Sequence, residues 1–527
     1  MLRKINNDLR PKNIDYRLTL LPILTAFLLV LAFPNFNLGF LAWIALIPLF
    51  FAIEGKGIRH RFISGYLFGI SFFSGIFYWL LNVSVPATVL LILLSALYPA
   101  IFCSLASLRT VHIRWSIIFI PSLWVLTEFI RAHIFSGSPW ALLAHSQSQN
   151  LPIIQIADIT GAYGVSFLLV LVNFAIYLAF KKTPGRFYIL LSVFLIVLLV
   201  SIYGERKMGI VYTGQTLKVA VIQGNIPQEQ KWDPGHRSSI LDKYAALTKE
   251  ASKKAPHLIV WPESSVPGFL EDENDLRRRI TGLAREGKAH ILVGTLRGTE
   301  SDVYNSATFV SDEGEILKSY DKIHLVPFGE FIPFESLFPW IRGSVDKPIG
   351  DYSCGKEHTV FNFTTEEAVT GSGAIHRTTV FHRFSVLICF EDIFPDLSRE
   401  FVNKGARFLV NITNDAWFGK TSAPYQHMQG SVFRAIENRV PVIRSANTGF
   451  SCVINHNGEV ITYVMADNDS IFVDGYLVDL ITPVSVKTFY TKFGDLFSWA
   501  CVLIVIFVGT VSIAKGARLK RTVSAGG

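Results

Sequence analysis

Three side chains in the second half of the chain have the chemistry needed for acyl transfer. Cys389 ends the apolar run FSVLIC, Glu263 follows HLIVWP, and Lys322 lies in SYDKIHLVPFGE after another strand-like run. Only a thiolate is a good nucleophile, so a carboxylate must take the proton of the cysteine. A lysine ammonium and the backbone N–H of Phe390 would stabilise the oxyanion that forms when the thiolate attacks a carbonyl. The set predicts a covalent acyl-cysteine intermediate.

Taken singly, each of these residues has an ordinary structural explanation. A cysteine behind apolar residues is usually a small buried hydrophobe. Glu263 and Lys322 are compatible with solvated surface charges, and Glu330 and Glu391 with structural ion pairs. Catalysis is favoured only because the three chemical types occur together, each beside the end of a strand-like run.

The elements that must position these residues follow an α/β pattern. From Leu217 onward, short apolar strands such as LKVAVIQ alternate with amphipathic helices as far as IFVDGYLV at 471–478. The pattern predicts covered sheets in one large domain over residues 205–490. Ligands gather outside the strand ends of such sheets, so residues from separate strands can converge on one crevice.

The rest of the chain is too apolar for a soluble protein. Of its 527 residues, 50% are hydrophobic and only 17% are charged. Apolar stretches of membrane-spanning length predict about eight transmembrane helices, of which the second is short. They cover residues 18–34, 39–53, 62–82, 86–108, 115–133, 164–180, 187–204 and 493–514. The predicted bundle thus occupies residues 1–204, and the last helix with its tail occupies 491–527.

Lysine and arginine are confined to alternate connections of this bundle. They occur in both terminal tails and in residues 54–61, 109–114 and 181–186, but not in residues 34–38, 83–86 and 134–163. By the positive-inside rule, both termini are cytoplasmic and the large α/β domain is outside. Outside these basic tails and connections, the chain holds 32 basic and 38 acidic residues. The formal net charge of +8 therefore comes from the predicted cytoplasmic segments and gives no support to nucleic-acid binding.

Several segments have two interpretations. The composition of residues 340–378 favours an exposed, flexible excursion without chemistry over a mobile lid. Residues 134–163, charged only at Asp158, form either a structural cap over the bundle or one wall of a lipid-accessible site. Glu128 and Arg131, on the preceding helix, are either a functional intramembrane pair or a satisfied structural one.

Three aromatic loops of the α/β domain also have two interpretations. They either face the lipid headgroups, with Arg342 and Lys420 near phosphates, or belong to the core. They are PGFL at 267–270, SLFPWIRG at 336–343 and AWFGK at 416–420.

Neither a metal site nor a cofactor is predicted. The 13 histidines show no HExxH pattern, and His427 and His382 have no partners at ligand spacing. No glycine-rich phosphate loop follows a strand. Whether Cys354 and Cys452 form a disulfide is left open.

The motifs WPES, YDKIHLVPFGE and LICFED, in this order, resemble the Glu-Lys-Cys triad of the nitrilase (carbon-nitrogen hydrolase) superfamily. The runs QGNIPQEQKWDP and PWALLAHSQ, with the domain inserted before the last helix, resemble the apolipoprotein N-acyltransferase family within it. The resemblance implies an αββα sandwich with Glu263 as general base, Lys322 as oxyanion stabiliser and Cys389 as nucleophile.

The resemblance also implies supporting residues. Glu330 and Glu391 match acids that lie near the triad, and Trp232 matches a tryptophan near the substrate entrance. Phe390 stands where relatives often have tyrosine, so a role for a hydroxyl is lost there while the backbone N–H is unaffected. The insertion around 362–378 is longer than the family leads us to expect.

The implied reaction moves an acyl chain between two lipids. A membrane phospholipid would donate the chain from its sn-1 position to Cys389, and the resulting thioester would pass it to the N-terminal amine of a diacylglyceryl-cysteine apolipoprotein. The implied location is the bacterial inner membrane, with a multi-pass bundle and the catalytic domain on the periplasmic side.

The main alternative is a membrane-anchored nitrilase-type amidase that hydrolyses a small amide or nitrile. It shares the triad and differs in whether water or an amine receives the acyl group. A transporter is disfavoured because the spans contain few charged or helix-breaking residues. A lipid-binding scaffold is disfavoured because binding alone does not require glutamate, lysine and cysteine together.

Overall fold

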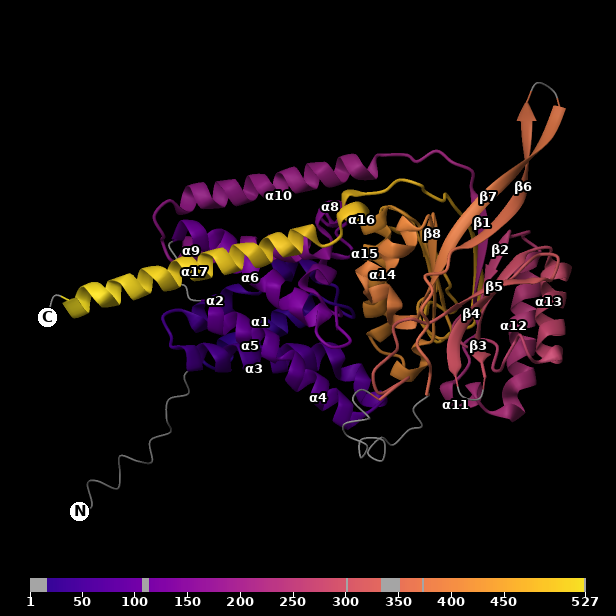
Figure 1. Ribbon diagram of the computed structural model, residues 1–527, viewed down its shortest axis with the longest axis horizontal. Coiled ribbons are helices and arrows are strands. Elements are labelled where there is room, and N and C mark those ends of the chain that lie inside the picture. Colours follow the sequence, from indigo (N-terminus) through magenta and orange to yellow (C-terminus); the bar gives the residue numbers. More distant parts are fainter. Residues whose placement is uncertain (1–16, 107–112, 300–301, 333–350, 372–373, 526–527) are drawn as a thin grey trace, which may run out of the picture.

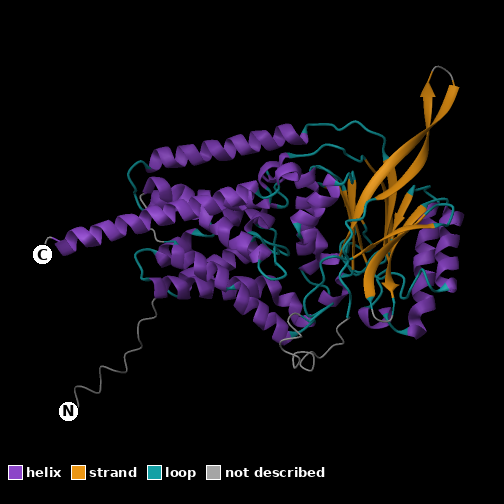
Figure 2. Ribbon diagram, in the orientation of Figure 1, coloured by secondary structure: helices purple, strands orange, loops and turns teal. Residues whose placement is uncertain are grey.

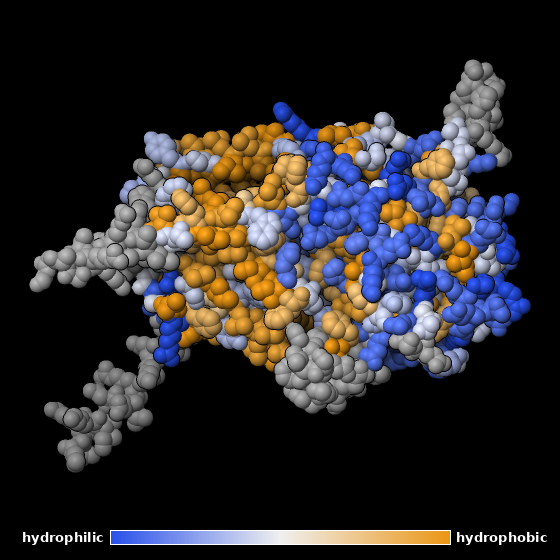
Figure 3. All heavy atoms as spheres, in the orientation of Figure 1, coloured by the Kyte–Doolittle hydropathy of each residue, from blue (hydrophilic) through white to orange (hydrophobic). Residues whose placement is uncertain are grey.

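The protein has a helical part and an α/β part, which lie end to end along its longest axis (Figures 1 and 2). The computed structural model describes residues 17–106, 113–299, 302–332, 351–371 and 374–525. Apolar residues dominate the surface of the helical part, and hydrophilic residues dominate the surface of the α/β part (Figure 3). This division is what a lipid-embedded bundle joined to a water-exposed domain requires.

The helical part is built from the first ten α-helices and the long last one. Its α-helices are α1 (Leu20–Leu31), α2 (Ile47–Ile53), α3 (Ile58–Phe77), α4 (Val85–Ser95), α5 (Leu97–Leu105), α6 (Ile113–His133), α7 (Leu151–Ile154), α8 (Ala157–Thr160), α9 (Ala162–Phe180), α10 (Arg186–Met208) and α17 (Leu496–Ala525). The 3-10 turns between them are η2 (Gly39–Trp43), η3 (Tyr78–Asn82) and η4 (Leu143–Gln147).

Five helical segments among the described residues are long and apolar enough to cross a membrane. They are Ile58–Asn82, Val85–Leu105, Trp115–His133, Ala162–Phe180 and Arg186–Met208. The other predicted spans correspond to the shorter apolar helices Leu20–Leu31, Gly39–Ile53 and Leu496–Ser512. Several helices are therefore long and apolar enough to span a membrane, and the number eight stays a prediction.

The α/β part contains two six-stranded sheets. The first has the order β12-β1-β2-β3-β4-β5 and the second the order β11-β10-β9-β8-β7-β6. The strands are β1 (Leu217–Gln223), β2 (Leu258–Val260), β3 (His290–Gly298), β4 (Val303–Val310), β5 (Ile316–Asp321), β6 (Phe361–Gly371), β7 (Ala374–Ile388), β8 (Phe408–Thr413), β9 (Val442–Ala446), β10 (Cys452–Ile454), β11 (Val460–Tyr463) and β12 (Gly475–Ile481).

Helices cover the outer face of each sheet, which gives the predicted αββα order. The helices α12 (Arg237–Ser252) and α13 (Asn274–Gly287) lie at the end remote from the bundle, whereas α14 (Pro395–Asn403) and α15 (Ala423–Asn438) lie between the second sheet and the bundle (Figure 1). Successive side chains of β1 point to opposite faces of the sheet and so pack in two different hydrophobic cores. Val219 and Val221 pack in the core shared with the second sheet, and Ala220 packs in the core with α12 and α13. The remaining short helices are α11 (Gln228–Lys231), η5 (Pro234–His236), η7 (Cys389–Ile393), η8 (Asp415–Phe418) and α16 (Phe489–Phe493).

The predicted catalytic residues come from both sheets. In the first sheet, β1, β2 and β3 are parallel neighbours, and in the second, β7, β8 and β9 are. Lys322 follows β5 directly, Cys389 follows β7 directly, and Glu263 comes soon after β2. All three residues therefore come at or soon after strand ends, as the sequence pattern predicts.

The expectation of an irregular excursion over residues 340–378 is wrong for its second half. Strands β6 and β7 pair as a long antiparallel hairpin, from Phe361 opposite Phe384 to Gly371 opposite Ala374. The hairpin extends well beyond the body of the domain (Figure 1). Threonine and valine, which favour strands, are frequent in both segments and explain the regular pairing. Residues 340–350, the greater part of the other half, lie outside the described residues.

The segment 134–163 forms a cap between the bundle and the α/β domain. It folds into η4, α7 and α8, and most of its central side chains are buried. Arg439 at the end of α15 donates to Asp158 at 2.9 Å, and Gln155 donates to the Asn457 carbonyl at 2.9 Å. Of the two interpretations of this loop, the structural cap is the one that these contacts match.

Candidate active site

Cys389 lies where β7 ends and the short helix η7 begins. Its φ angle of 57° is in the left-handed region, which few residues other than glycine adopt without strain. The first N–H groups of a helix have no partner within the helix, so the N–H of Phe390 is in the right position to bind an anion. Burial and the Glu263 carboxylate both raise the pKa of the Cys389 thiol, and Lys322 opposes them. The resting thiol therefore keeps its proton and needs a base.

Glu263, Lys322 and Glu330 form one buried charged cluster. The Lys322 Nζ lies 2.9 Å from Oε1 of Glu330 and 3.7 Å from Oε1 of Glu263. The amide nitrogen of Asn305 donates to both carboxylates, at 2.7 Å to Glu263 and 3.0 Å to Glu330. Burial disfavours the charge of Lys322, but Glu330, Cys389 and Glu263 together raise its pKa above the ordinary value. Lys322 is thus a fixed cation, and Glu330 is its nearest counter-ion.

A second buried lysine lies on the other side of Glu263. Lys231, at the end of α11, donates to the Glu263 carbonyl oxygen at 2.7 Å. Burial lowers the pKa of Lys231 to about 8, although Glu263 and Cys389 act in the opposite direction. The neighbouring Trp232 is 43% exposed, so α11 connects a surface tryptophan to the backbone of the predicted base. Lys231 and Asn305 were not predicted from the sequence as members of the site.

Glu391 joins the strand that ends in the cysteine to the loop that carries the lysine. Its carboxylate accepts hydrogen bonds from Tyr320 and from the backbone N–H groups of Ile323, His324 and Ile388, at 2.7–3.1 Å. Burial raises the pKa of Glu391 to about 7, although the three N–H donors oppose this. Its position supports a structural role beside the nucleophile.

Replacing Glu391 with glutamine should destabilise the α/β domain. The new NH₂ group would face backbone donors that now have an acceptor, and each buried donor left unpaired costs roughly 1–3 kcal/mol. We expect a lower thermal unfolding midpoint in detergent. Glu286→Gln is the matched control, since that side chain is 64% exposed and pairs with Lys249 at the surface. An unchanged midpoint for Glu391→Gln would contradict this role.

A buried charged network lies behind Cys389, and it was not predicted from the sequence. His427 of α15 lies between two carboxylates, with Nε2 2.9 Å from Asp392 and Nδ1 3.0 Å from Asp415. Arg444 of β9 binds the same two carboxylates, at 2.9 Å and 3.3 Å. All four side chains are essentially inaccessible to solvent. His427 has no partner at metal-ligand spacing along the sequence. In the folded protein it lies beside two carboxylates that come from other parts of the chain.

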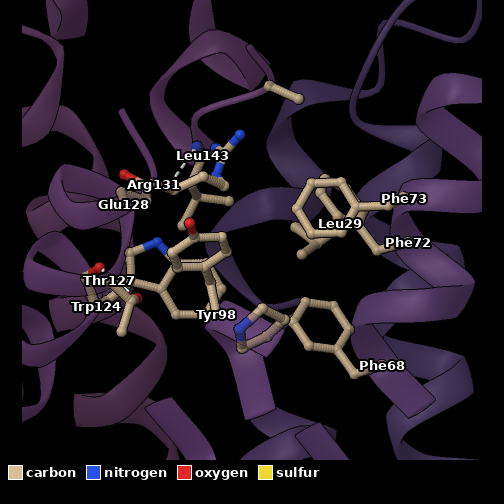
Figure 4. A pocket seen from close by; sticks show the side chains of 12 residues that line it. Leu29, Phe68, Phe72, Phe73, Tyr98, Trp124, Thr127, Glu128, Arg131 and Leu143 are labelled. Atoms are coloured by element: carbon tan, nitrogen blue, oxygen red, sulfur yellow. Dashed lines mark hydrogen bonds between the residues drawn. The ribbon is translucent and has the colours of Figure 1, made fainter. Parts of the chain in front are cut away.

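Glu128 and Arg131 line a small cavity in the bundle, of about 40 Å³, with aromatic walls that include Phe72 and Trp124 (Figure 4). Glu128 accepts from the N–H of Leu143 at 2.8 Å. Arg131 donates to the carbonyl oxygens of Ser138 and Trp140, each at 2.7 Å. Both side chains thus hold the backbone of the cap, while Oε2 of Glu128 is buried without a hydrogen-bond partner among the described residues. The choice between a functional and a structural pair stays a prediction.

The three aromatic loops differ from one another. In PGFL, Leu270 is fully buried in the core between the first sheet and its helices, whereas Phe269 is half-buried, so core packing applies to Leu270 alone. In AWFGK, the Phe418 ring packs against Trp79 at the end of the bundle, with ring centroids 4.6 Å apart, and Lys420 pairs with Asp469. Residues 336–343, including Arg342, lie outside the described residues.

The remaining candidate groups are explained by local contacts. Cys354 and Cys452 are both free thiols, so they do not form a disulfide in this structure. Ligand atoms of His133, Asp396 and Asp495 lie within 4.8 Å of one another. Asp396 is 3.6 Å from His133 and 3.8 Å from Arg399, so side-chain cations balance the cluster.

Comparison with known proteins gives matches along nearly the whole chain. The model of the apolipoprotein N-acyltransferase N-terminal domain matches residues 25–175, and the carbon-nitrogen hydrolase model matches residues 218–474. An apolipoprotein N-acyltransferase from Geobacter metallireducens is 39% identical over 95% of both chains. One from Shewanella oneidensis is 29% identical over 91% of this chain and 93% of its own. One from Brucella suis is 35% identical over 67% of this chain and 66% of its own.

Proposed function

The chain belongs to the apolipoprotein N-acyltransferase family, and on that premise we propose that Cys389 carries an acyl chain from a membrane phospholipid to the N-terminal amine of a diacylglyceryl-cysteine lipoprotein. N-acylation of lipoproteins is the function that its relatives' names give. The thioester, the phospholipid donor and the roles of the individual residues are the parts that we propose.

In the first half-reaction, Glu263 takes the proton of the Cys389 thiol and the thiolate attacks the ester carbonyl of the donor. Lys322 and the N–H of Phe390 stabilise the oxyanion of the tetrahedral intermediate. The intermediate then expels the glycerol oxygen, to which Glu263 returns the proton. The products are a Cys389 thioester and a lysophospholipid.

In the second half-reaction, the neutral α-amine of the acceptor attacks the thioester carbonyl. The same two donors stabilise the oxyanion, and Glu263 takes one proton from the attacking amine. The C–S bond breaks, the proton returns to the sulfur, and the amide product leaves. Substrates therefore alternate on one nucleophile, which predicts ping-pong kinetics.

One observation carries this proposal: Glu263 and Lys322 are buried within 3.7 Å of each other, and the charges of both act on the Cys389 thiol. Lys322 Nζ also lies 5.4 Å from the centre of the Phe390 ring, which places the ammonium beside the residue that follows the nucleophile. The arrangement matches a base, a cation and an N–H donor around one nucleophile. Glu330 supplies the counter-charge for Lys322, so Glu263 is left to exchange protons.

The location that we propose is a bacterial inner membrane, with both termini in the cytoplasm and the catalytic domain on the periplasmic side. Glu54 before α3 and Lys181 after α9 form an ion pair at 2.7 Å, so two connections with basic residues lie together. They lie at the end of the bundle remote from the α/β domain (Figure 1). The positive-inside rule then supports a cytoplasmic side at that end. The crevice would open toward the outer leaflet, where pulling a lipid out costs about 0.8 kcal/mol per CH₂.

The choice of acceptor separates this function from that of an anchored amidase. We expect that purified protein, given a phospholipid with a labelled sn-1 chain, transfers the label to the α-amine of a diacylated lipopeptide. The test follows the label by mass spectrometry with and without the lipopeptide. A blocked N-acetyl lipopeptide is the control and should accept nothing. Release of the label as free fatty acid at the same rate under all three conditions would refute the transferase.

A further inference from the structure

The carbonyl group of Cys389 is held from behind by two side chains. The Asn411 amide donates to this oxygen at 2.8 Å, and Nε2 of His427 lies 3.2 Å from it. Arg444 in turn donates to the Asn411 oxygen at 2.7 Å, which orients the amide. The left-handed conformation of Cys389 therefore has specific donors that stabilise it.

The surroundings of His427 require both of its ring nitrogens to carry hydrogen. Nδ1 faces Asp415, and Nε2 faces Asp392 and the Cys389 carbonyl. Carbonyl oxygens and ionised carboxylates only accept hydrogen bonds, so the ring must donate at both ends. Burial and Arg444 oppose the charge, yet Asp392 and Asp415 raise the pKa of His427 above its ordinary value. The imidazolium and Arg444 together balance the two carboxylates.

The peptide bond connects this clamp to the reaction. In a trans peptide the C=O of one residue and the N–H of the next point in opposite directions from one rigid plane. The bond between Cys389 and Phe390 is not among the cis bonds of the described residues. Holding the Cys389 carbonyl on the side of α15 therefore fixes the direction of the Phe390 N–H on the other side. A cationic donor on the carbonyl also polarises the amide and strengthens its N–H as a donor.

We propose that His427 is a positioning residue for acyl transfer, which clamps the Cys389 carbonyl so that the Phe390 N–H points at the developing oxyanion. The inference rests on the proposed function, because it needs an acyl-cysteine whose carbonyl enters the oxyanion site. Asp392 and Asp415 hold the imidazolium in place, and Ser431 donates a further hydrogen bond to Asp392. The ring of Trp140, from the cap, packs on His427 with centroids 5.2 Å apart and closes the network toward the bundle.

His427→Gln tests the clamp. Glutamine can donate to only one side and carries no charge, so the N–H of Phe390 should lose its alignment. We expect the rate constants of both half-reactions to fall by on the order of 10²-fold, the usual effect of losing one oxyanion donor. The KM for phospholipid should stay the same, because the carbonyl clamp does not bind the lipid chains.

An infrared measurement gives a signature that a purely structural role would not produce. A hydrogen bond to a thioester carbonyl lowers its stretching frequency, so the ¹³C-labelled acyl-enzyme of His427→Gln should absorb at a higher frequency than the wild-type acyl-enzyme. Asp415→Asn keeps the side-chain volume and an acceptor for Nδ1, and should shift rate and frequency in the same directions by less. It provides the same test if His427→Gln does not fold.

His382→Gln is the matched control. His382 is also buried, but it lies on β7 seven residues before the nucleophile and bonds Thr365. It should leave rates and frequency unchanged. Unchanged rates in His427→Gln, or slower rates with an unchanged carbonyl frequency, would overturn the clamp. Failure of the wild-type protein to form an acyl-enzyme at all would instead refute the proposed function.

Discussion

Replacing Cys389 with alanine should abolish both half-reactions. Without a thiol no thioester can form, and neither Glu263 nor Lys322 can substitute as a nucleophile for an ester carbonyl. We expect no acyl mass on the peptide that contains residue 389 after incubation with phospholipid, and no N-acylated lipopeptide. Intact-protein and peptide mass spectrometry measure the first, and lipopeptide mass spectrometry the second. Because the residue is a small one at a strand end, membrane insertion should be unaffected.

Cys354→Ser is the matched control for this experiment. Cys354 is exposed and donates to the Ile323 carbonyl, a contact that a serine hydroxyl can keep. The variant should form the acyl-enzyme at the wild-type rate. If Cys389→Ala still accumulated a thioester, another cysteine would be the nucleophile and the assignment of the site would be wrong.

Glu263→Gln should have the second-largest effect. Removing a general base typically lowers the rate by about 10²–10⁴-fold, and we expect this loss in acyl-enzyme formation near neutral pH. The change should also give the reaction a new dependence on pH. Burial and the negative charge of Glu263 raise the pKa of the Cys389 thiol, so the neutral glutamine should lower that pKa.

The direction of the pH effect follows from the missing base. In the variant, only thiolate formed by loss of a proton to solvent can react, and its fraction rises with pH. The residual rate of Glu263→Gln should therefore increase through the alkaline range, and the ratio of wild-type to variant rates should shrink. Single-turnover acylation across pH measures this. Glu250→Gln on α12, an exposed carboxylate paired with Lys253, is the control and should match the wild type. A variant with the wild-type rate and pH profile would rule out Glu263 as the base.

The strand-end pattern was sufficient to predict which residues would meet. Cys389, Lys322 and Glu263 come at or soon after the ends of apolar runs that are easy to recognise, and the strand ends of two packed sheets can converge on one site. The αββα order could likewise be predicted from alternating strands and helices together with the family motifs. The specific contacts between the charges could not, because they depend on how two sheets pack against each other.

The network around His427 illustrates what the sequence leaves hidden. Asp392 lies in the helical turn that follows β7, Asp415 follows β8, and Arg444 is within β9, so three elements far apart in the chain contribute to it. Nothing in their spacing identifies a common partner. A signal was nevertheless present, because Asp392 and Asp415 come soon after strand ends, as the predicted catalytic residues do. Applying the strand-end rule to every acidic residue would have selected both.

The hairpin β6–β7 was missed for a different reason. Residues 361–378 are small and polar, which suggested disorder, yet they also alternate around the glycine-containing turn that two paired strands require. The polar composition of this segment favours disorder, whereas the alternation of its residues favours paired strands, and the alternation is the signal that the structure follows. In the bundle, apolar length alone identified the helical segments, but it cannot decide whether a short apolar helix such as Leu20–Leu31 spans a bilayer.

The position of α15 means that this protein is not a catalytic module tethered to an interchangeable anchor. One side of this helix places His427 at 3.2 Å from the Cys389 carbonyl oxygen, and Arg439, just past its end, pairs with Asp158 of the cap. Trp140 touches the same histidine from the membrane side. An isolated α/β domain would leave Arg439 without its buried partner and would expose the edge of the histidine network to water. The helical bundle and the α/β domain must therefore fold together, and their contacting residues must evolve together. A chimera that exchanges the bundle between relatives must also exchange the cap.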